Sequence, residues 1–519
     1  MKGGFIVLFL ASAVSLRAGD LDIIGVTALR QVDPTLTGKG VEVAQAEAPV
    51  STNSPPPFEV SPAYVGQPTN LFTWISSLGT ATSFPNSVGA ESGHTDTVGA
   101  NFYGVTNGPA TNIVHVDNYE CVNFFNAFIA PGFSIPARVV NQSFIYDSSV
   151  ELLVNTNYDD YAAQHGTIFL NGIYGAGGSP PICPPGSSYN GIGVGAYYAF
   201  NLPGPTDDGR CKPDIIAPDL AEFPNGAVSY TTPYVAGTAA ILVQAANRRD
   251  GGANTNAAGD LRTIKALLLN GAIKPNGWTN GTSAPLDARY GAGMVNVLNS
   301  WEQLKGGQHA FIEFTTNSSG GTHPPGTNSN NEPVLVGWDY NTNSTTASTD
   351  TAKHYYFNLP GGNPCTQTAT LVWNKQSGKA GINNLNLFLY NTANSNLVTC
   401  STSQVDNVEH IFLPALAPGR YDLQVLKLGS AGQVSASEPY ALAFEIFTMP
   451  LSARETNNQV VISWPVAPTG FQLQSAGSLN PPVSWATVTN PVTITTNQDL
   501  VSLPVGGGSQ FFRLVRPSF

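Results

Sequence analysis

A serine stands directly before a long apolar stretch in the segment Ala227-Val228-Ser229-Tyr230-Thr231-Thr232-Pro233-Tyr234-Val235-Ala236-Gly237. This pattern predicts a helix over Thr232–Arg248, entered through Pro233, where a proline is tolerated because its missing N–H needs no partner. A second helix is predicted over Asp260–Asn270. Four short apolar runs upstream are typical of buried parallel strands: Val41–Ala46, Asn112–Asp117, Arg138–Phe144 and Gly166–Leu170. Strands alternating with helices predict an α/β domain over residues 20–306, a parallel sheet with helices on both faces.

The texture of the sequence changes after about Leu304. Residues 310–447 carry alternating apolar and polar segments between turns rich in Gly, Asn and Ser, which predicts a β-sandwich. Its strands are expected at Thr368–Trp373, Asn386–Tyr390, His410–Leu413 and Tyr421–Val425. Its opening, Thr315–Asn343, is rich in Asn, Ser, Thr and Gly and is predicted to be a loose loop. Residues 449–519 repeat the β texture on a smaller scale and predict a small all-β C-terminal domain.

The composition is consistent with such a chain. Of the 519 residues 42% are hydrophobic and only 11% charged, with 53 Gly and 39 Pro, which is too apolar for disorder and too rich in Gly and Pro for a helical bundle. The net charge is −12, and no run of Lys or Arg occurs. Because nucleic-acid binding requires a basic face that neutralises phosphates, a nucleic-acid partner is not expected.

The N-terminus has the features of a secretory signal peptide over residues 1–18. Lys2 precedes the apolar stretch Phe5–Leu16, and the small residues Ala18 and Gly19 follow it. The alternative is a membrane anchor, but the stretch is shorter than the roughly 20 residues needed to span a bilayer. We therefore expect a secreted or cell-surface protein without a membrane span after cleavage.

The chain has five cysteines, Cys121, Cys183, Cys211, Cys365 and Cys400. In an oxidising compartment an odd number leaves at least one without a partner in the chain. Neighbourhood in sequence suggests Cys183–Cys211 and Cys365–Cys400 as the pairs. No cysteine or histidine cluster has metal-ligand spacing. No cofactor is expected, and although structural calcium is an open alternative, no acidic loop identifies a site for it.

Three residues carry the chemistry through their order in the chain. Glu47 ends the strand predicted in the segment GKGVEVAQAE, His94 opens a predicted helix in HTDTVG, and Ser229 precedes the apolar helix. An acid, a histidine and a serine in this order match one of the known arrangements of a nucleophilic triad. Singly each signal is weak, since a serine before a helix is most often only an N-cap.

The flanking segments strengthen this interpretation. Over roughly residues 36–300 the chain resembles the subtilisin-like serine peptidases (subtilases), whose motifs include DGRxKPDIxAPG and TPxVAG. The segments that carry the resemblance are Gly38–Val41 (GKGV), Arg138–Ser143 (RVVNQS), Asn190–Ala196 (NGIGVGA), Asp208–Pro218 (DGRCKPDIIAP) and Thr232–Gly237 (TPYVAG). Residues 310–447 resemble the β-sandwich that often follows such domains. Residues 449–519 look like C-terminal segments of exported bacterial proteins.

The resemblance implies that Ser229 is the nucleophile, His94 the general base and Glu47 the acid, in a position where the family has aspartate. It also places Gly175 where the family has the asparagine that donates to the oxyanion. Asn171 could replace that asparagine only if its loop were rearranged. Loss of one such donor costs on the order of 10²–10³ in turnover.

Other residues differ from those of the family at positions that affect the reaction rate and the access of substrate. Ala227 and Val228 replace the glycine and threonine expected before the serine, and Ile145 stands where the family usually has a glycine. The stretch between the predicted signal peptide and the catalytic segment is short for the folded propeptide common in the family. By contrast Asp96, His115, Asp117 and His165 are expected to be ordinary polar residues.

Three functions follow from these observations. The first is a secreted serine endopeptidase that cleaves protein or peptide substrates through a Glu47–His94–Ser229 triad, with a weakened oxyanion hole. The second is an impaired relative that uses the scaffold for binding or surface structure. A purely adhesive β-domain protein is the third. Retention of both His94 and Ser229 favours the first, since a protein without catalysis has no chemical need for that pair.

Overall fold

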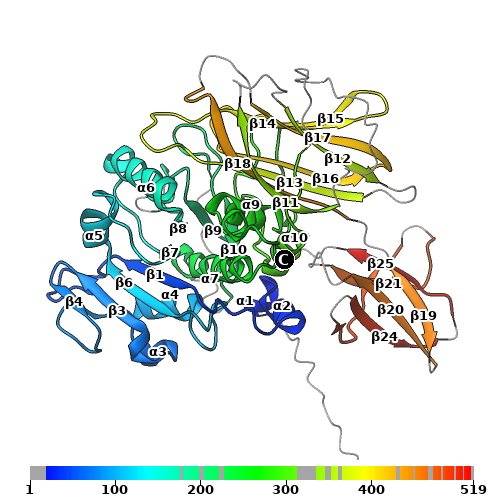
Figure 1. Ribbon diagram of the computed structural model, residues 1–519. Coiled ribbons are helices and arrows are strands. Elements are labelled where there is room, and N and C mark those ends of the chain that lie inside the picture. Colours follow the sequence, from blue (N-terminus) through cyan, green and yellow to red (C-terminus); the bar gives the residue numbers. More distant parts are fainter. Residues whose placement is uncertain are drawn as a thin grey trace, which may run out of the picture.

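The computed structural model describes residues 19–175, 178, 180–197, 204–220, 227–311, 335–344, 352–359, 365–427, 433–447, 451–456, 458–465, 471–480, 483–495, 498–506 and 508–515. The predicted signal peptide lies outside the described residues. An α/β domain, a β-sandwich and a small β domain follow one another along the chain (Figure 1).

The α/β domain is built on an eight-stranded sheet in the order β10-β9-β8-β7-β1-β6-β3-β4. Neighbouring strands run parallel except for the edge hairpin β3–β4. The strands are β1 (Glu42–Glu47), β3 (Phe72–Ser76), β4 (Gly79–Ala81), β6 (His115–Glu120), β7 (Val139–Gln142), β8 (Ile168–Gly172), β9 (Ile192–Ala196) and β10 (Ile215–Ala217). All four predicted strands are present, with bounds that differ by a few residues.

Helices cover both faces of this sheet, as the sequence predicts. On one face α6 (Glu151–His165) packs Tyr158 against Phe169 of β8, with ring centroids 5.1 Å apart. On the other, α7 (Val228–Asn247) approaches β8 so closely that a Cβ added to Gly172 would lie 3.1 Å from the Thr232 hydroxyl oxygen. Phe169 and Gly172 point to opposite faces because side chains alternate along a strand.

The remaining helical and short strand elements of this domain connect the sheet strands and frame the sheet. They are α1 (Asp20–Ile23), α2 (Val26–Val32), β2 (Pro57–Glu59), α3 (Pro62–Val65), η1 (Thr69–Leu71), β5 (Ala90–Glu91), α4 (Gly93–Phe102), α5 (Cys121–Phe124), η2 (Phe125–Ile129), η3 (Ser148–Val150), α8 (Thr255–Ala258), α9 (Leu261–Asn270) and α10 (Val297–Lys305).

The helix that carries the serine begins a turn earlier than predicted. Its N-cap is Ala227, so Ser229 is the second residue of the first turn, and Pro233 lies inside the helix. A proline inside a helix leaves the carbonyl four residues earlier without its usual N–H donor, here that of Ser229. The prediction placed the start at Thr232 because proline favours the first turn, but here the apolar and small residues before it are helical as well.

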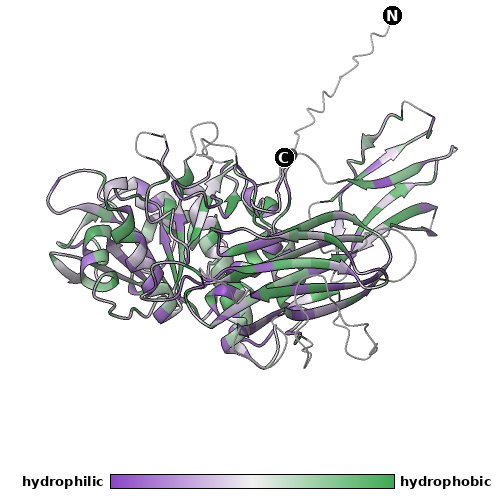
Figure 2. Ribbon diagram, turned by 90° about the horizontal axis from the view of Figure 1, so that it is seen from above, coloured by the Kyte–Doolittle hydropathy of each residue, from purple (hydrophilic) through white to green (hydrophobic). Residues whose placement is uncertain are grey.

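The β-sandwich consists of two four-stranded antiparallel sheets, β11-β18-β13-β16 and β12-β17-β14-β15. The strands are β11 (Val336–Ser344), β12 (Ala352–Leu359), β13 (Cys365–Trp373), β14 (Leu385–Asn391), β15 (Asn396–Ser401), β16 (Val408–Leu416), β17 (Gly419–Lys427) and β18 (Ser437–Phe447). Hydrophilic and hydrophobic residues alternate along them (Figure 2). The four predicted strands are confirmed.

The prediction of a loose loop over Thr315–Asn343 is wrong for its last part. From Val336 the chain forms β11, which pairs with β18 along its whole length. The buried Trp338 anchors the strand, and Asn343, also buried, donates to the Val425 carbonyl at 3.0 Å. These tertiary contacts outweigh the weak strand propensity of Asn and Ser. The part of the predicted loop before residue 335 lies outside the described residues.

The sandwich and the α/β domain share one hydrophobic core. Trp338, Val372, Val408, Ala441 and Ala443 belong to the same buried cluster as the helices and sheet of the α/β domain. The sheet containing β13 and β18 lies directly on α9. The sandwich is therefore an integral layer of the molecule and not a spacer.

The C-terminal domain lies to one side of the other two (Figures 1 and 2). Its two sheets have the orders β19-β20-β24-β23 and β22-β21-β25, around a small core that includes Trp464 and Val501. The strands are β19 (Ser452–Thr456), β20 (Gln459–Pro465), β21 (Gln472–Ala476), β22 (Ala486–Thr487), β23 (Thr493–Ile494), β24 (Gln498–Pro504) and β25 (Phe511–Val515). No helix in the described part of the chain is long and apolar enough to span a membrane.

Neither disulfide pairing suggested by the sequence is formed, since the structure joins none of the five cysteines to another. Cys365 and Cys400 lie on β13 and β15, which belong to opposite sheets of the sandwich. Packed sheets are about 10 Å apart, beyond the reach of a disulfide between their strands. The Cys183 N–H donates to the Tyr174 carbonyl within the α/β domain, whereas the Cys211 N–H donates to Asp406 of the sandwich.

Candidate functional site

The candidate site lies at the edge of the sheet where the parallel strands end. In parallel sheets the carboxyl ends of all strands meet at one edge, which is where ligands bind in open α/β folds. Glu47 is the last residue of β1, and Ser143 and Tyr174 follow β7 and β8. The start of α7 lies at the same edge, beside Ser143.

Glu47 and His94 are hydrogen-bonded to each other, and they form an ion pair when His94 is protonated. The Glu47 Oε2 lies 3.1 Å from His94 Nδ1; the glutamate side chain is fully buried and the imidazole is 27% exposed. His94 occupies the first turn of α4, whose N-cap Ser92 accepts a hydrogen bond from the Thr95 N–H. With Nδ1–H donated to the carboxylate, Nε2 is the nitrogen left to accept a proton. The structure thus brings together two of the residues that the sequence singles out.

Burial lowers the pKa of His94, but the charge of Glu47 and the hydrogen bond to it raise the pKa by more, so that it lies above its ordinary value. An imidazole held in this way is both oriented and stabilised in the charged form that arises when it accepts a proton.

Ser229 is followed in the chain by a residue that lies beside His94. The rings of His94 and Tyr230, the residue after the serine, have centroids 5.6 Å apart. The Ser229 hydroxyl donates to the Ser143 carbonyl at 3.3 Å, and the Ser143 hydroxyl donates to the Ser229 carbonyl at 2.8 Å. Among the described residues no hydrogen bond joins Ser229 to His94. Catalytic hydrogen bonds of apo enzymes are often long and tighten only with substrate. A proton transfer from Ser229 to His94 would require the Ser229 side chain to turn away from the Ser143 carbonyl.

The Ser229 N–H is one donor available for an oxyanion. It belongs to the first four N–H groups of α7, which have no partner inside the helix, and the positive end of the helix dipole lies there. Asn171 does not supply the second donor. Its amide is buried and donates to the Pro185 carbonyl at 3.0 Å and to Ser188 at 3.3 Å. Gly175 is buried and has no side chain to donate.

An apolar cavity of about 220 Å³ opens beside Ser229. Pockets that hold drug-sized ligands measure about 300–1,000 Å³, so this cavity is smaller and has room for about one side chain. Its walls come from the ends of β7 and β8 and the start of α7: Ser143, Phe144, Ile145, Gly172, Tyr174, Ala227, Val228 and Ser229.

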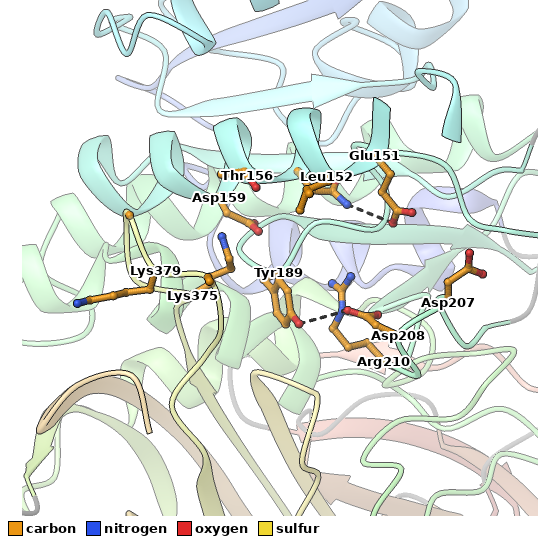
Figure 3. Close-up of a pocket in the computed structure, with 13 residues that line it drawn as sticks. Glu151, Leu152, Thr156, Asp159, Tyr189, Asp207, Asp208, Arg210, Lys375 and Lys379 are labelled. Atoms are coloured by element: carbon orange, nitrogen blue, oxygen red, sulfur yellow. Dashed lines mark hydrogen bonds and ion pairs between the residues drawn. The ribbon is translucent and has the colours of Figure 1, made fainter. Parts of the chain in front are cut away.

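A second cavity, of about 610 Å³, lies between α6 and the sandwich and shares no residue with the first (Figure 3). The Arg210 guanidinium lies 3.8 Å above the Tyr189 ring, and its Nε is 2.9 Å from both carboxylate oxygens of Asp208. Asp159 accepts a hydrogen bond from the Asn190 N–H at 2.8 Å. Arg210 and Asp208 therefore form an ion pair within the wall of this cavity.

Sequence reasoning missed three residues of the first site: Gln45, Tyr103 and Ser143. Gln45 precedes Glu47 by two positions, and the alternation of a strand could have placed the two side chains on one face. Nothing in the sequence marks Tyr103 or the Ser143 contact. In the described part of the chain, no group of three or more His, Cys, Asp or Glu side chains is placed to hold a metal ion.

No protein-family model and no curated protein matches the chain. Among solved structures, it is similar to tripeptidyl peptidase 2 at 13% identity and a TM-score of 0.31, over 75% of this chain and 43% of that one. The pre-peptidase C-terminal domain of a collagenase from Bacillus anthracis matches at 18% identity and a TM-score of 0.15, over 20% of this chain and 87% of that domain. The chain thus spans less than half the length of the peptidase it matches. We therefore infer a function from the residues of this chain alone.

Proposed function

We propose that this chain is an exported serine endopeptidase in which Ser229 attacks the peptide carbonyl, His94 takes the serine proton and Glu47 orients His94. The observation that carries the proposal is the 3.1 Å contact of the buried Glu47 with His94, whose ring lies beside Tyr230, the residue after Ser229 in the first turn of α7. A buried carboxylate is costly unless it is paired, and pairing with a histidine is what acyl transfer requires.

In this reaction the Ser229 oxygen forms a bond to the substrate carbonyl carbon, and its proton passes to His94 Nε2. The oxyanion is stabilised by the Ser229 N–H at the start of α7. His94 then returns the proton to the leaving amine, and water releases the acyl group from Ser229 by the same steps. The cavity of about 220 Å³ suits an apolar side chain of the substrate on the acyl side of the bond.

A second function, a binding scaffold with impaired catalysis, is favoured by the contact of the Ser229 hydroxyl with the Ser143 carbonyl. In that case the hydroxyl stays with Ser143, and the site lacks both the nucleophile and a second oxyanion donor.

Labelling of the purified protein with a fluorophosphonate probe separates the two functions. A competent serine is labelled in the wild type and not in Ser229→Ala, with Ser300→Ala, which changes a buried serine of α10, as a matched serine control that retains label. Absence of label from a folded wild type, measured beside a known serine peptidase, would rule out the nucleophile and leave the scaffold. A peptide library digested by the active protein then tests the preference for apolar residues.

A further inference from the structure

Gln45 connects the acid of the site to the helix that carries the histidine. Gln45 and Glu47 lie two residues apart on β1, so their side chains share one face of the sheet. The Gln45 amide nitrogen donates to Glu47 Oε1 at 2.9 Å and to the Thr95 carbonyl at 2.9 Å. Thr95 follows His94 in the chain, so one amide group holds both partners of the ion pair.

Tyr103 fixes the orientation of this amide. Its hydroxyl donates to Gln45 Oε1 at 2.5 Å, and both side chains are fully buried. Burial, with the charges of Glu47 and Asp96, raises the pKa of Tyr103 well above its ordinary value, so the hydroxyl stays a donor. An amide has one acceptor and two donors. Tyr103 occupies the acceptor, and the NH₂ group is thereby directed at Glu47 and Thr95.

Gly99, which has no side chain, leaves space for the hydrogen bond between Tyr103 and Gln45. A Cβ placed on Gly99 would lie 2.9 Å from the Tyr103 hydroxyl oxygen and 3.2 Å from Gln45 Oε1. A larger residue at position 99 would displace the bond between Tyr103 and Gln45.

We propose that Gln45 is a positioning residue that orients the Glu47 carboxylate toward His94, and that Tyr103 in turn holds Gln45. The role rests on the proposed triad. It accounts for a glutamate in the place of the acid, because glutamate has one more rotatable bond than aspartate and needs a second contact to fix its carboxylate. Each carboxylate oxygen has its own partner: Gln45 holds Oε1, and His94 is bound to Oε2.

The first test uses Gln45→Met and Tyr103→Phe, which remove the amide and its anchor with little change in volume. Gln244→Met is the matched control, because Gln244 is a buried, hydrogen-bonded glutamine that contacts the loop before β1 and not the site. Loss of orientation is expected to lower kcat of Gln45→Met by about 10–10²-fold, with KM little changed. Tyr103→Phe should lower it less, because the amide remains.

A double-mutant cycle separates positioning from a general effect on folding. If Gln45 acts through Oε1 of Glu47, the shorter side chain of Glu47→Asp already breaks this contact. Adding Gln45→Met to Glu47→Asp should then lower kcat little further. Independent effects would instead multiply, which would overturn the proposal.

NMR titration of His94 keeps the test separate from that of the peptidase activity. A carboxylate released by Gln45→Met leaves His94, and the His94 pKa falls in this variant but not in Gln244→Met, even in a protein without turnover. An unchanged His94 pKa in folded Gln45→Met and Tyr103→Phe would overturn the positioning role. Absence of turnover in the wild type with a shifted pKa would instead reject only the peptidase.

Discussion

Ser143 and Ser229 exchange hydrogen bonds, each hydroxyl donating to the carbonyl of the other. The shorter of the two, at 2.8 Å, satisfies the Ser229 carbonyl. That carbonyl lacks an intrahelical donor because Pro233 has no N–H. Ser143 thus takes the place of a helix hydrogen bond at the residue proposed as the nucleophile.

This relationship predicts that a substitution at position 233 restores the stability lost by a substitution at position 143. Ser143→Ala leaves the Ser229 carbonyl without its donor and should reduce the free energy of unfolding by about 1–2 kcal/mol. Adding Pro233→Ala supplies an N–H four residues along the helix and should recover most of that loss. Urea unfolding of the wild type, the two single variants and the double variant measures the coupling; additive effects would contradict it.

Removal of the charge at Glu47 should change both the rate and its pH dependence. His94 must be neutral to accept a proton, and its pKa is raised, so the wild-type rate should reach its plateau only above neutral pH. In Glu47→Gln the effect of burial remains alone, and the rising limb moves to lower pH while the plateau falls by about 10⁴-fold. Fluorophosphonate labelling rates between pH 5 and 9 give both quantities. A plateau within tenfold of the wild type would show that Glu47 has no such role.

The oxyanion position should respond to Gly175 and not to Asn171. Gly175→Asn adds an amide donor and is expected to raise turnover by about 10-fold or more, toward the 10²–10³ that such a donor supplies elsewhere. Asn171→Ala removes an amide that is already bonded to Pro185 and Ser188, so it should reduce stability but leave the labelling rate nearly unchanged. A large loss of labelling in folded Asn171→Ala would mean that this amide turns toward the substrate.

Glu59 should make the folded state less stable as the pH rises. Burial raises its pKa to about 7, despite a hydrogen bond from Asn86, and its Oε1 accepts no hydrogen bond from any residue that the structure describes. A carboxyl with a raised folded-state pKa contributes stability below its unfolded pKa, and this contribution is lost as the pH rises through about 7. Glu59→Gln should therefore be more stable than the wild type at pH 8, by about 2 kcal/mol.

The advantage of Glu59→Gln should vanish at pH 4. Urea unfolding at the two pH values tests it, with the exposed Glu455→Gln as the control that shows no such difference. Equal effects of Glu59→Gln at both pH values would contradict an ionisation penalty.

Asn190 should hold the sandwich to the α/β domain. Its side chain accepts from the Lys375 N–H at 2.8 Å and donates to the Lys375 carbonyl at 2.9 Å and the Asp159 carbonyl at 2.8 Å. Asn190→Ala leaves these buried groups unpaired and should cost about 2–4 kcal/mol. Hydrogen exchange should then increase around residue 375 before the rest of the sandwich. The control is the half-buried Asn157→Ala on α6, whose amide donates only to the Leu153 carbonyl of the same helix. Equal effects of the two variants would exclude the role.

Much of the fold follows from the sequence because its signals are local. The apolar runs near Val139 and Ile168 form the predicted strands, and the helix predicted over Asp260–Asn270 is α9, which begins one residue later at Leu261. The prediction failed where tertiary contacts outweigh local preference. In β11 the buried Trp338 and the pairing with β18 make a strand of residues whose composition favours a loop.

In the candidate site, too, the sequence predicts what depends on local pattern and not what depends on tertiary contacts. The order of Glu47, His94 and Ser229 is visible in the sequence, and the structure brings the first two into contact. The direction of the Ser229 hydroxyl is not visible, because it depends on Ser143, 86 residues away in the chain. Tyr103 reaches Gln45 across 58 residues, a contact that no local pattern can reveal.

The shared core has a consequence for the order of events in synthesis. Side chains of the sandwich, from Trp338 to Ala443, complete the hydrophobic cluster that also holds the strand with the acid and the helix with the serine. A ribosome delivers those side chains after the whole α/β domain, so that domain keeps part of its apolar surface uncovered until the sandwich has emerged. A nascent chain truncated before β18 (Ser437–Phe447) should accordingly remain a client of chaperones, and the two domains should appear as a single event in a folding experiment.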